Sequence, residues 1–417
     1  MQNFVNILMK STDVNRNKIF NKLKDDDNYY LLSGGKTSTR QFSDVDIKFR
    51  QDSNFFWLTG LDMPDFQILF NGFYRKIILV SPGYDINYTI WHGEIPDLNK
   101  IVKNYNFSSC ITKKELESCL YNEPKVLKLL IENSRIIKNK YEIKIIRQAC
   151  KISTLIHNKI IFQKKMFIKK NERNIANFFK YQTHEFKYVD NLAYPTIVGS
   201  GRNSSILHYT KNDKIIEKKN IVLLDAGCEF MNYASDITTT FPIDDKFDKY
   251  QQEIYDIVFT ANKISKEMIK EGVNFKDIYF KSLDTIYTGI RDLKLINLAK
   301  QKEYNLSNFQ VAKLLMPHGL GHFLGLDVHD VGGSLYKYSN EIGLQSENKE
   351  YDIGVDLLEN MVITIEPGIY FISSLILKYN NLFTKKILCY FHLGGFRIED
   401  DILVTKNGFE QLNDVVR

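Results

Sequence analysis

Hydrophobic and polar positions follow two different patterns along the chain, and the change falls near residue 136. Before it, short apolar runs such as Lys76–Pro82 predict strands, and Lys113–Leu120 predicts a short helix with Thr112 as its N-cap. From Lys140 to Lys165, apolar residues recur at helical spacing and predict one long helix. We therefore expect a small α/β domain over residues 1–135 and a second domain over residues 136–417.

The second domain combines helical periods with several alternating or apolar segments. Helices flanking a mainly antiparallel sheet predict an α+β fold for this half. The polar segment Asn340–Tyr351 has no clear period and is interpreted as a loop. The remaining expected helices span 172–186, 248–272 and 275–291, and the expected strands lie near 194–198, 221–241, 361–372 and 395–405.

Two aspartates stand out within this half because the pattern places them on one hairpin. Ile221–Leu224 is apolar and Ala234–Phe241 alternates, so the two segments are typical of paired strands. With a turn near Phe230–Met231, Asp225 and Asp236 become direct cross-strand partners, with Cβ atoms about 5 Å apart. Two ionised carboxylates that close repel each other, so either one is protonated or a cation lies between them.

Three histidines follow within twelve residues, at His318, His322 and His329, and glycines surround them. On an extended backbone His318 and His322 face the same way, whereas His329 needs a turn to join them. A single histidine is usually structural, but glycines allow the close backbone approach that a shared site requires.

Two glutamates complete the set of candidate ligands. Glu366 ends an apolar strand just before Pro-Gly, where the alternative is a capped strand end. Glu399 shares one strand face with Arg397 and Asp401, where the alternative is a surface Arg–Glu pair. Four carboxylates and one imidazole are hard ligands, sufficient for two divalent cations, so a two-metal hydrolase is the leading hypothesis.

Composition narrows the class of protein without changing this hypothesis. With 44% hydrophobic and 25% charged residues among 417, the chain is typical of a soluble globular protein of two domains. The net charge of +6 comes from lysines interleaved with acids, which does not favour a nucleic-acid partner. Five cysteines without Cys-x-x-Cys spacing, no evident signal peptide and no long apolar segment indicate a cytoplasmic protein without a membrane partner.

Two phosphate-loop lookalikes fail on spacing. Gly34-Gly35-Lys36-Thr37 resembles the end of a Walker A motif, but Tyr30 stands where a glycine is required. The glycines of Gly319–Gly325 have the wrong final spacing for a dinucleotide fingerprint and follow no β-run.

Taken in order, these segments resemble the pita-bread metallopeptidases, in particular their proline-directed branch of prolidase and aminopeptidase P. The resemblance covers essentially the whole chain, because the amino-terminal half also carries a motif similar to theirs. The resembling segments are Phe49–Gly60, Ala193–Gly201, Ile206–Tyr209, Met316–Gly333, Thr364–Phe371 and Arg397–Asp401.

The resemblance implies a dinuclear centre, typically of manganese, held by Asp225, Asp236, His322, Glu366 and Glu399. Asp236 and Glu399 would bridge the two ions, a hydroxide held between the ions would attack the scissile carbonyl, and Glu366 would shuttle its proton. The other implied residues are His208 and His329 for substrate and oxyanion contacts, His318 and Arg397 in support, Tyr194 in the substrate pocket, and Trp91 as a pocket wall supplied by the neighbour in a homodimer.

The expected substrate is a small peptide with proline at its second position. Two observations bear on the subtype of enzyme: the first counts against a prolidase and the second counts for one. Prolidases carry an arginine about fourteen residues before the Glu-Pro-Gly glutamate, but Tyr351–Asp356 has none and Lys349 is the nearest cation. The 33-residue interval from Glu366 to Glu399 includes the longer insert typical of prolidases. We therefore expect an Xaa-Pro dipeptidase, with an Xaa-Pro aminopeptidase as the alternative.

Two further readings remain open on the same scaffold. One is a non-catalytic pita-bread module that binds proteins or nucleic acid, and the other is a metal-free enzyme like creatinase. Both predict loss of one or more ligands, whereas all five are present here.

Overall fold

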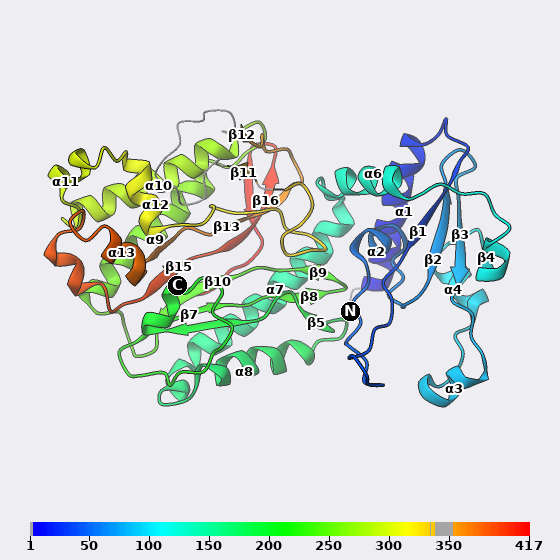
Figure 1. Cartoon of the computed structure of the whole chain (residues 1–417), viewed down its shortest axis with the longest axis horizontal. Coiled ribbons are helices and arrows are strands. Elements are labelled where there is room, and N and C mark those ends of the chain that lie inside the picture. Colours follow the sequence, from blue (N-terminus) through cyan, green and yellow to red (C-terminus); the bar gives the residue numbers. More distant parts are fainter. Residues whose placement is uncertain (1–2, 334, 338–352) are drawn as a thin grey trace. The chain divides into compact units, whose positions relative to one another are not determined.

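The computed structural model describes residues 3–333, 335–337 and 353–417 (Figure 1). The chain divides into two compact units, Met1–Ile145 and Ile146–Arg417, and the division falls within helix α7 (Lys140–Phe162). The boundary expected from the sequence pattern, at 135/136, lies before this helix begins. The expected loop Asn340–Tyr351 lies outside the described residues.

The amino-terminal unit is built on a four-stranded sheet of order β1-β2-β3-β4. Its first three strands are antiparallel and β4 joins β3 in parallel, so this unit is α/β as expected. The Thr112 cap is present with Glu115 in a capping box, but the helix ends at Leu116. The elements are α1 (Phe4–Lys22), β1 (Tyr29–Ser33), α2 (Ser53–Thr59), β2 (Gln67–Asn71), β3 (Lys76–Ser81), α3 (Ile86–His92), α4 (Leu98–Asn104), β4 (Ser109–Thr112), α5 (Lys113–Leu116) and α6 (Lys125–Arg135).

The larger unit contains short sheets flanked by long helices, and among the described residues its paired strands are all antiparallel, which confirms the α+β expectation. Its sheets have the orders β10-β7-β6, β13-β16-β17, β14-β15, β5-β8-β9 and β11-β12. The helical elements are α7, η1 (Lys164–Phe167), α8 (Glu172–His184), η2 (Gly201–Ser205), α9 (Lys249–Glu267), α10 (Phe275–Asp292), α11 (Leu298–Glu303), α12 (Asn308–Leu315), α13 (Ser373–Lys378) and η4 (Lys385–Cys389). The strands are β5 (Asn191–Leu192), β6 (Ile197–Ser200), β7 (Ile221–Asp225), β8 (Cys228–Phe230), β9 (Tyr233–Ala234), β10 (Thr238–Pro242), β11 (Tyr336–Lys337), β12 (Ile353–Gly354), β13 (Val362–Ile365), β14 (Gly368–Tyr370), β15 (Gly395–Arg397), β16 (Asp400–Thr405) and β17 (Gly408–Gln411).

The expected simple hairpin between Asp225 and Asp236 is wrong in its register. Strand β7 pairs with β10 so that Asp225 lies opposite Thr238, and Asp236 precedes the paired strand. A second, smaller hairpin of β8 and β9 is inserted between them. It turns at Met231 and Asn232, both with positive φ (50° and 63°), as type I′ turns require. The inserted hairpin removes the direct pairing that an alternation count suggests.

Helix α7 runs along the sheets of the larger unit (Figure 1) and packs on them with one face. Its buried apolar residues recur at helical spacing, as the sequence pattern predicts. The same face also carries His157, whose Nε2 lies 2.9 Å from the carbonyl oxygen of Ala226, the residue after β7. Across the described ranges, helix length and hydropathy fall short of what a bilayer crossing requires.

We predict that His157 makes stability depend on pH. Burial lowers the pKa of His157 to about 4, from an ordinary value of 6.5. The unfolded chain therefore takes up a proton that the folded chain refuses, so stability falls as pH drops from about 6.5 to about 4 and levels off below that. Compared with His157→Gln at each pH, the wild type should lose about 3 kcal/mol more across this range in denaturant titrations. An identical pH profile for both proteins would contradict the assignment.

Candidate metal centre

The candidate ligands lie at strand ends, so backbone pairing fixes where each one starts. Asp225 ends β7, and Asp236 lies two residues before β10. Glu366 directly follows β13, and Glu399 lies between β15 and β16. The Glu399 amide donates to the Thr238 carbonyl at 3.0 Å, which joins the two halves of the cluster.

His322 is held by an extended segment alongside β13. The segment exchanges backbone hydrogen bonds with the strand, from Glu366 N to Leu320 O (2.8 Å) and from Thr364 N to His322 O (2.9 Å). A Cβ on Gly321 would lie 2.0 Å from the Thr364 carbonyl oxygen, so only glycine allows this approach. The His322 Nδ1–H faces the Phe323 carbonyl at 2.9 Å, which leaves Nε2 directed at the acids.

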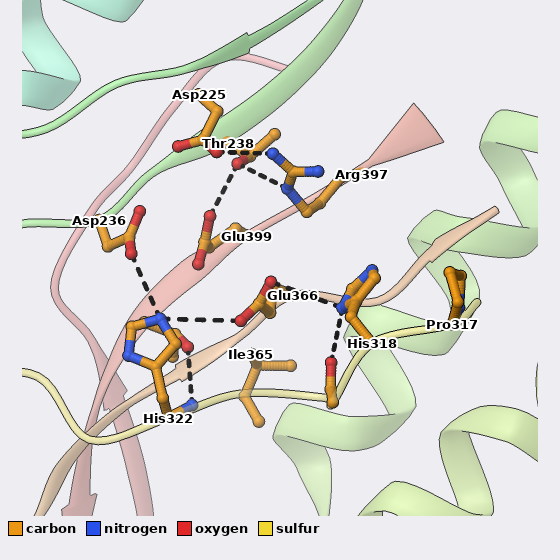
Figure 2. Close-up of polar contacts among 12 residues, drawn as sticks. Asp225, Asp236, Thr238, Pro317, His318, His322, Ile365, Glu366, Arg397 and Glu399 are labelled. Carbon is orange, nitrogen blue, oxygen red and sulfur yellow. Dashed lines mark hydrogen bonds and ion pairs between the residues drawn. The ribbon is translucent and has the colours of Figure 1, made fainter. Parts of the chain in front are cut away.

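The five residues converge in space (Figure 2). Ligand atoms of Asp225, Asp236 and Glu399 lie within 4.8 Å of one another, and so do those of His322, Glu366 and Glu399. Glu399 belongs to both groups. This arrangement matches two adjacent cation sites that share a carboxylate.

The surroundings of the acids disfavour their ionised forms. Burial is the main cause that raises the pKa of Glu366 to about 7; the charges of His322 and Arg397 oppose it, and those of Asp236 and Asp225 add to it. Burial is also the largest cause that raises the pKa of Asp225 and of Glu399, where neighbouring carboxylates add to it and Arg397 opposes it. The Oδ1 atom of Asp225 is buried without a hydrogen-bond partner among the described residues. A buried lone pair without a donor, inside a crowded acidic cluster, fits a divalent cation.

His322 responds to the same field. Burial by itself lowers the pKa of His322, but the hydrogen bond to Asp236 and the charge of Glu366 outweigh it and raise the pKa to about 9. Its Nε2 lies 3.3 Å from Asp236 Oδ2 and 3.7 Å from Glu366 Oε1. The site therefore attracts positive charge at the position that a metal would occupy.

Arg397 is buried beside the cluster, and each of its three guanidinium nitrogens donates a hydrogen bond there. Its Nη2 donates to Asp225 Oδ2 at 2.6 Å, its Nε to Thr238 Oγ1 at 3.0 Å, and its Nη1 to the Tyr370 hydroxyl at 2.9 Å. The Thr238 hydroxyl in turn donates a hydrogen bond to Glu399 Oε2 at 2.7 Å. Arg397 thus orients two candidate ligands, one directly and one through Thr238 (Figure 2).

Asp401 orients Asp236 from the other side. Its carboxylate accepts from the Asp236 amide at 3.0 Å and from the Cys150 thiol of α7 at 3.1 Å. Burial, followed by the charge of Asp236, raises the pKa of Asp401 well above its usual range. Helix α7 therefore takes part in setting the backbone of the metal cluster.

His318 lies at the edge of the cluster as a neutral imidazole. Burial is the main reason that the pKa of His318 falls to about 3. Its Nδ1 faces the Gly319 carbonyl at 2.7 Å, so Nε2 accepts from the Tyr370 hydroxyl at 2.9 Å. Tyr370 in turn accepts from Arg397, which links His318 to the ligands by one continuous chain of hydrogen bonds.

A cavity of about 830 Å³ opens onto the cluster. Tyr194, His208, His318 and His329 line it together with all five candidate ligands. The ring centroids of His329 and His322 are 4.0 Å apart, so the chain supplies the turn that His329 needed. Apolar lining comes from Pro195, Ile197, Leu207 and Val328.

Trp91 does not line this cavity. It lies on α3 of the amino-terminal unit and is 76% exposed, and its expected role as a pocket wall supplied by a neighbouring chain stays a prediction. The structure adds three residues to which the sequence gave no role in the site, Thr238, Tyr370 and Asp401. Thr238 could have been found, since it shares a strand face with Asp236.

Comparisons with known proteins show the family. The model of metallopeptidase family M24 matches residues 144–406, and the model of the aminopeptidase P N-terminal domain matches residues 13–127. The chain belongs to metallopeptidase family M24. Its pita-bread fold and its metallo-exopeptidase class, both expected from the sequence, are thereby confirmed.

Similar proteins to this M24 peptidase are named as aminopeptidases. A probable Xaa-Pro aminopeptidase pepP from Pyrenophora tritici-repentis is 32% identical, over 91% of this chain and 88% of its own length. The structure of Pseudomonas aeruginosa aminopeptidase PepP has a TM-score of 0.79 at 25% identity, covering 97% and 94% of the two chains. Zinc-substituted Escherichia coli aminopeptidase P, in complex with product, has a TM-score of 0.79 at 23% identity, covering 98% and 96%. These comparisons do not support the expectation of a prolidase in particular.

We predict that a divalent cation stabilises this M24 peptidase through the acidic cluster. Because binding neutralises repulsion between buried carboxylates, free Mn²⁺ at about 100 times its Kd should add ~2.7 kcal/mol to the free energy of unfolding. Chelation should reverse the gain, as measured by thermal unfolding. Asp236→Ala should abolish most of the stabilisation, whereas Asp256→Ala, at an exposed position on α9, serves as the matched control. Equal stabilisation of the Asp236→Ala variant would place the cation elsewhere.

Proposed function

We propose that the protein is an Xaa-Pro aminopeptidase with two divalent metal ions, manganese being the expected metal. The observation that carries the proposal is the convergence of five hard ligands at the floor of one cavity. The names of the relatives support the choice of substrate class.

In this proposal Asp225, Asp236 and Glu399 would hold one ion, and His322, Glu366 and Glu399 would hold the other. The sharing of Glu399 between two ligand groups supports this division. When bound, the ions supply Lewis acidity and lower the pKa of a coordinated water by several units.

The protein's own residues then hold the substrate and move protons. Glu366 is only partly exposed and lines the cavity, which places its carboxylate where it can accept a proton and return it to the leaving nitrogen. His208, His329 and Tyr194 line the cavity where a bound peptide would lie. His318 supports them through Tyr370, and Arg397 fixes Asp225, so we assign Arg397 to ligand orientation and not to substrate binding.

The cavity favours the aminopeptidase over the dipeptidase. A dipeptidase needs a free cation for the carboxylate of its substrate. The only arginine or lysine among the described lining residues is Arg397, and each of its three guanidinium nitrogens already donates a hydrogen bond, to Thr238, Tyr370 or Asp225. The stretch Tyr351–Asp356, where prolidases carry their arginine, is described only from residue 353, and Lys349 lies outside the described residues.

The insert that favoured a prolidase does not reach the cavity. Between Glu366 and Arg397 no residue belongs to the lining. The insert instead folds as α13 and η4 and bonds to α9 and the α10–α11 connection, as Tyr390 does to Glu253 and Thr384 to Leu295. The length of the insert between Glu366 and Arg397 therefore does not indicate whether the enzyme acts on dipeptides or on longer peptides.

We predict a preference for longer peptides. With Mn²⁺ bound, kcat/KM for Ala-Pro-Pro-Ala should exceed that for Ala-Pro by about tenfold or more, because a free carboxylate at proline finds no cation and added residues gain contacts. The measurement is initial-rate release of alanine from both peptides, with Ala-Pro-amide as the control that removes the charge. Faster cleavage of Ala-Pro than of its amide would instead favour the dipeptidase.

We predict that Glu366→Gln lowers kcat by at least about a hundredfold, since an amide cannot accept the proton. Metal content by mass spectrometry separates this loss from a loss of binding. The matched control is Glu253→Gln, an acid that bonds Tyr390 outside the lining of the cavity. Undiminished turnover of a fully metal-loaded Glu366→Gln variant would remove Glu366 from the proton path.

A further inference from the structure

Glu172, the first residue of α8, is a completely buried carboxylate outside the metal cluster. Its Oε1 accepts from the Ser200 amide and hydroxyl, both at 2.7 Å, and from Asn203 Nδ2 at 3.1 Å. Its Oε2 accepts from the Tyr209 hydroxyl at 2.8 Å and from the Lys214 amide at 3.1 Å. Five donors from one continuous segment, 200–214, therefore meet at a single side chain.

No ion pair among the described residues involves Glu172, so dipoles alone balance its charge. The donors are neutral N–H and O–H groups, assisted by the amino terminus of α8. A buried charge without a counter-ion is expensive unless every lone pair is satisfied. The hydrogen bonds to Glu172 fix both ends of segment 200–214 against α8.

That segment carries His208, and nothing else in the described structure fixes the His208 ring. His208 is solvent-exposed and makes no side-chain hydrogen bond with the described residues, although it lines the cavity. Its neighbour Tyr209 is 6% exposed, packs in a cluster with Ile197, Leu223 and Tyr370, and bonds to Glu172. The position of His208 is thus set through the backbone by the anchored tyrosine beside it.

The start of the segment is held from its other side by the strand that carries Arg397. Ser204 Oγ accepts from the Gly395 amide at 2.7 Å. Gly394 has φ +91°, and a Cβ there would lie 2.0 Å from the Gly201 carbonyl oxygen, so the two backbones are in direct contact. Glu172 therefore contacts η2 on one side and β15 contacts it on the other. These contacts fix the position at which the following loop begins.

We propose that Glu172 is a positioning residue for substrate, acting through Tyr209 to hold His208 against the cavity. The proposal rests on the proposed peptidase function and adds a residue that contacts neither metal ligand nor substrate. It assigns to α8 a role in turnover, through a chain from Glu172 to Tyr209 to His208.

A double-mutant cycle on kcat/KM tests the chain. Glu172→Gln places an amide NH₂ against donors, and we expect kcat/KM for an Xaa-Pro peptide to fall about tenfold or more with metal content unchanged. In a His208→Ala background the same change should cost less than about twofold, because the ring to be positioned is gone. Equal losses in both backgrounds would overturn the proposal. Tyr209→Phe, which removes one hydroxyl, repeats the test with less risk to folding.

Hydrogen–deuterium exchange gives a readout that does not need activity. Amides of 206–211 should exchange faster in Glu172→Gln and Tyr209→Phe than in the wild type. Glu142→Gln, a buried acid of the amino-terminal unit that bonds Trp57, should leave this exchange and kcat/KM unchanged. Unchanged exchange in both test variants would overturn the proposal even in an active enzyme. Wild-type protein inactive on all Xaa-Pro peptides, with the expected exchange, would instead count against the proposed function.

Discussion

Repulsion among buried carboxylates dominates the catalytic unit. Asp225, Asp236 and Glu399 present oxygens within 4.8 Å of one another, and Glu366 meets Glu399 at a similar range. In a low-dielectric interior such a cluster is stable only with added positive charge. Arg397 and a protonated His322 supply part of that charge. Under the proposed function, two divalent cations would supply the rest.

The scaffold resists this repulsion by placing each ligand on backbone that has little freedom. Strand ends carry the carboxylates, and the histidine segment is hydrogen-bonded along β13. Arg397, Thr238 and Asp401 then restrict the side chains and amides of the ligands themselves. Such preorganisation lets the free energy of metal binding act on chemistry and not on rearrangement.

Away from the ligands, the segment 200–214 is held by neutral donors around Glu172 and contributes His208 to the lining of the cavity. Neutral dipoles surround the charge of Glu172, whereas Arg397 and His322 face the carboxylates of the acidic cluster directly. The acidic cluster and the Glu172 network meet at β15, which carries Arg397 on one side and contacts η2 on the other. Strand β15 therefore contacts both the cluster of candidate ligands and the segment 200–214.

The sequence by itself determined the identity of the chemistry. Hard ligands at strand ends, glycines around His322 and the long period of α7 are local properties, because they depend on residue type and spacing alone. Register was not local: the hairpin of β8 and β9 could not be distinguished from a simple turn by alternation, so the pairing of Asp225 with Thr238 was missed. Nor could the sequence show that the nitrogens of Arg397 donate to Asp225, Thr238 and Tyr370, or that the insert before it avoids the cavity. Those facts depend on contacts between residues far apart in the chain, such as Arg397 and Asp225, and only tertiary packing creates such contacts.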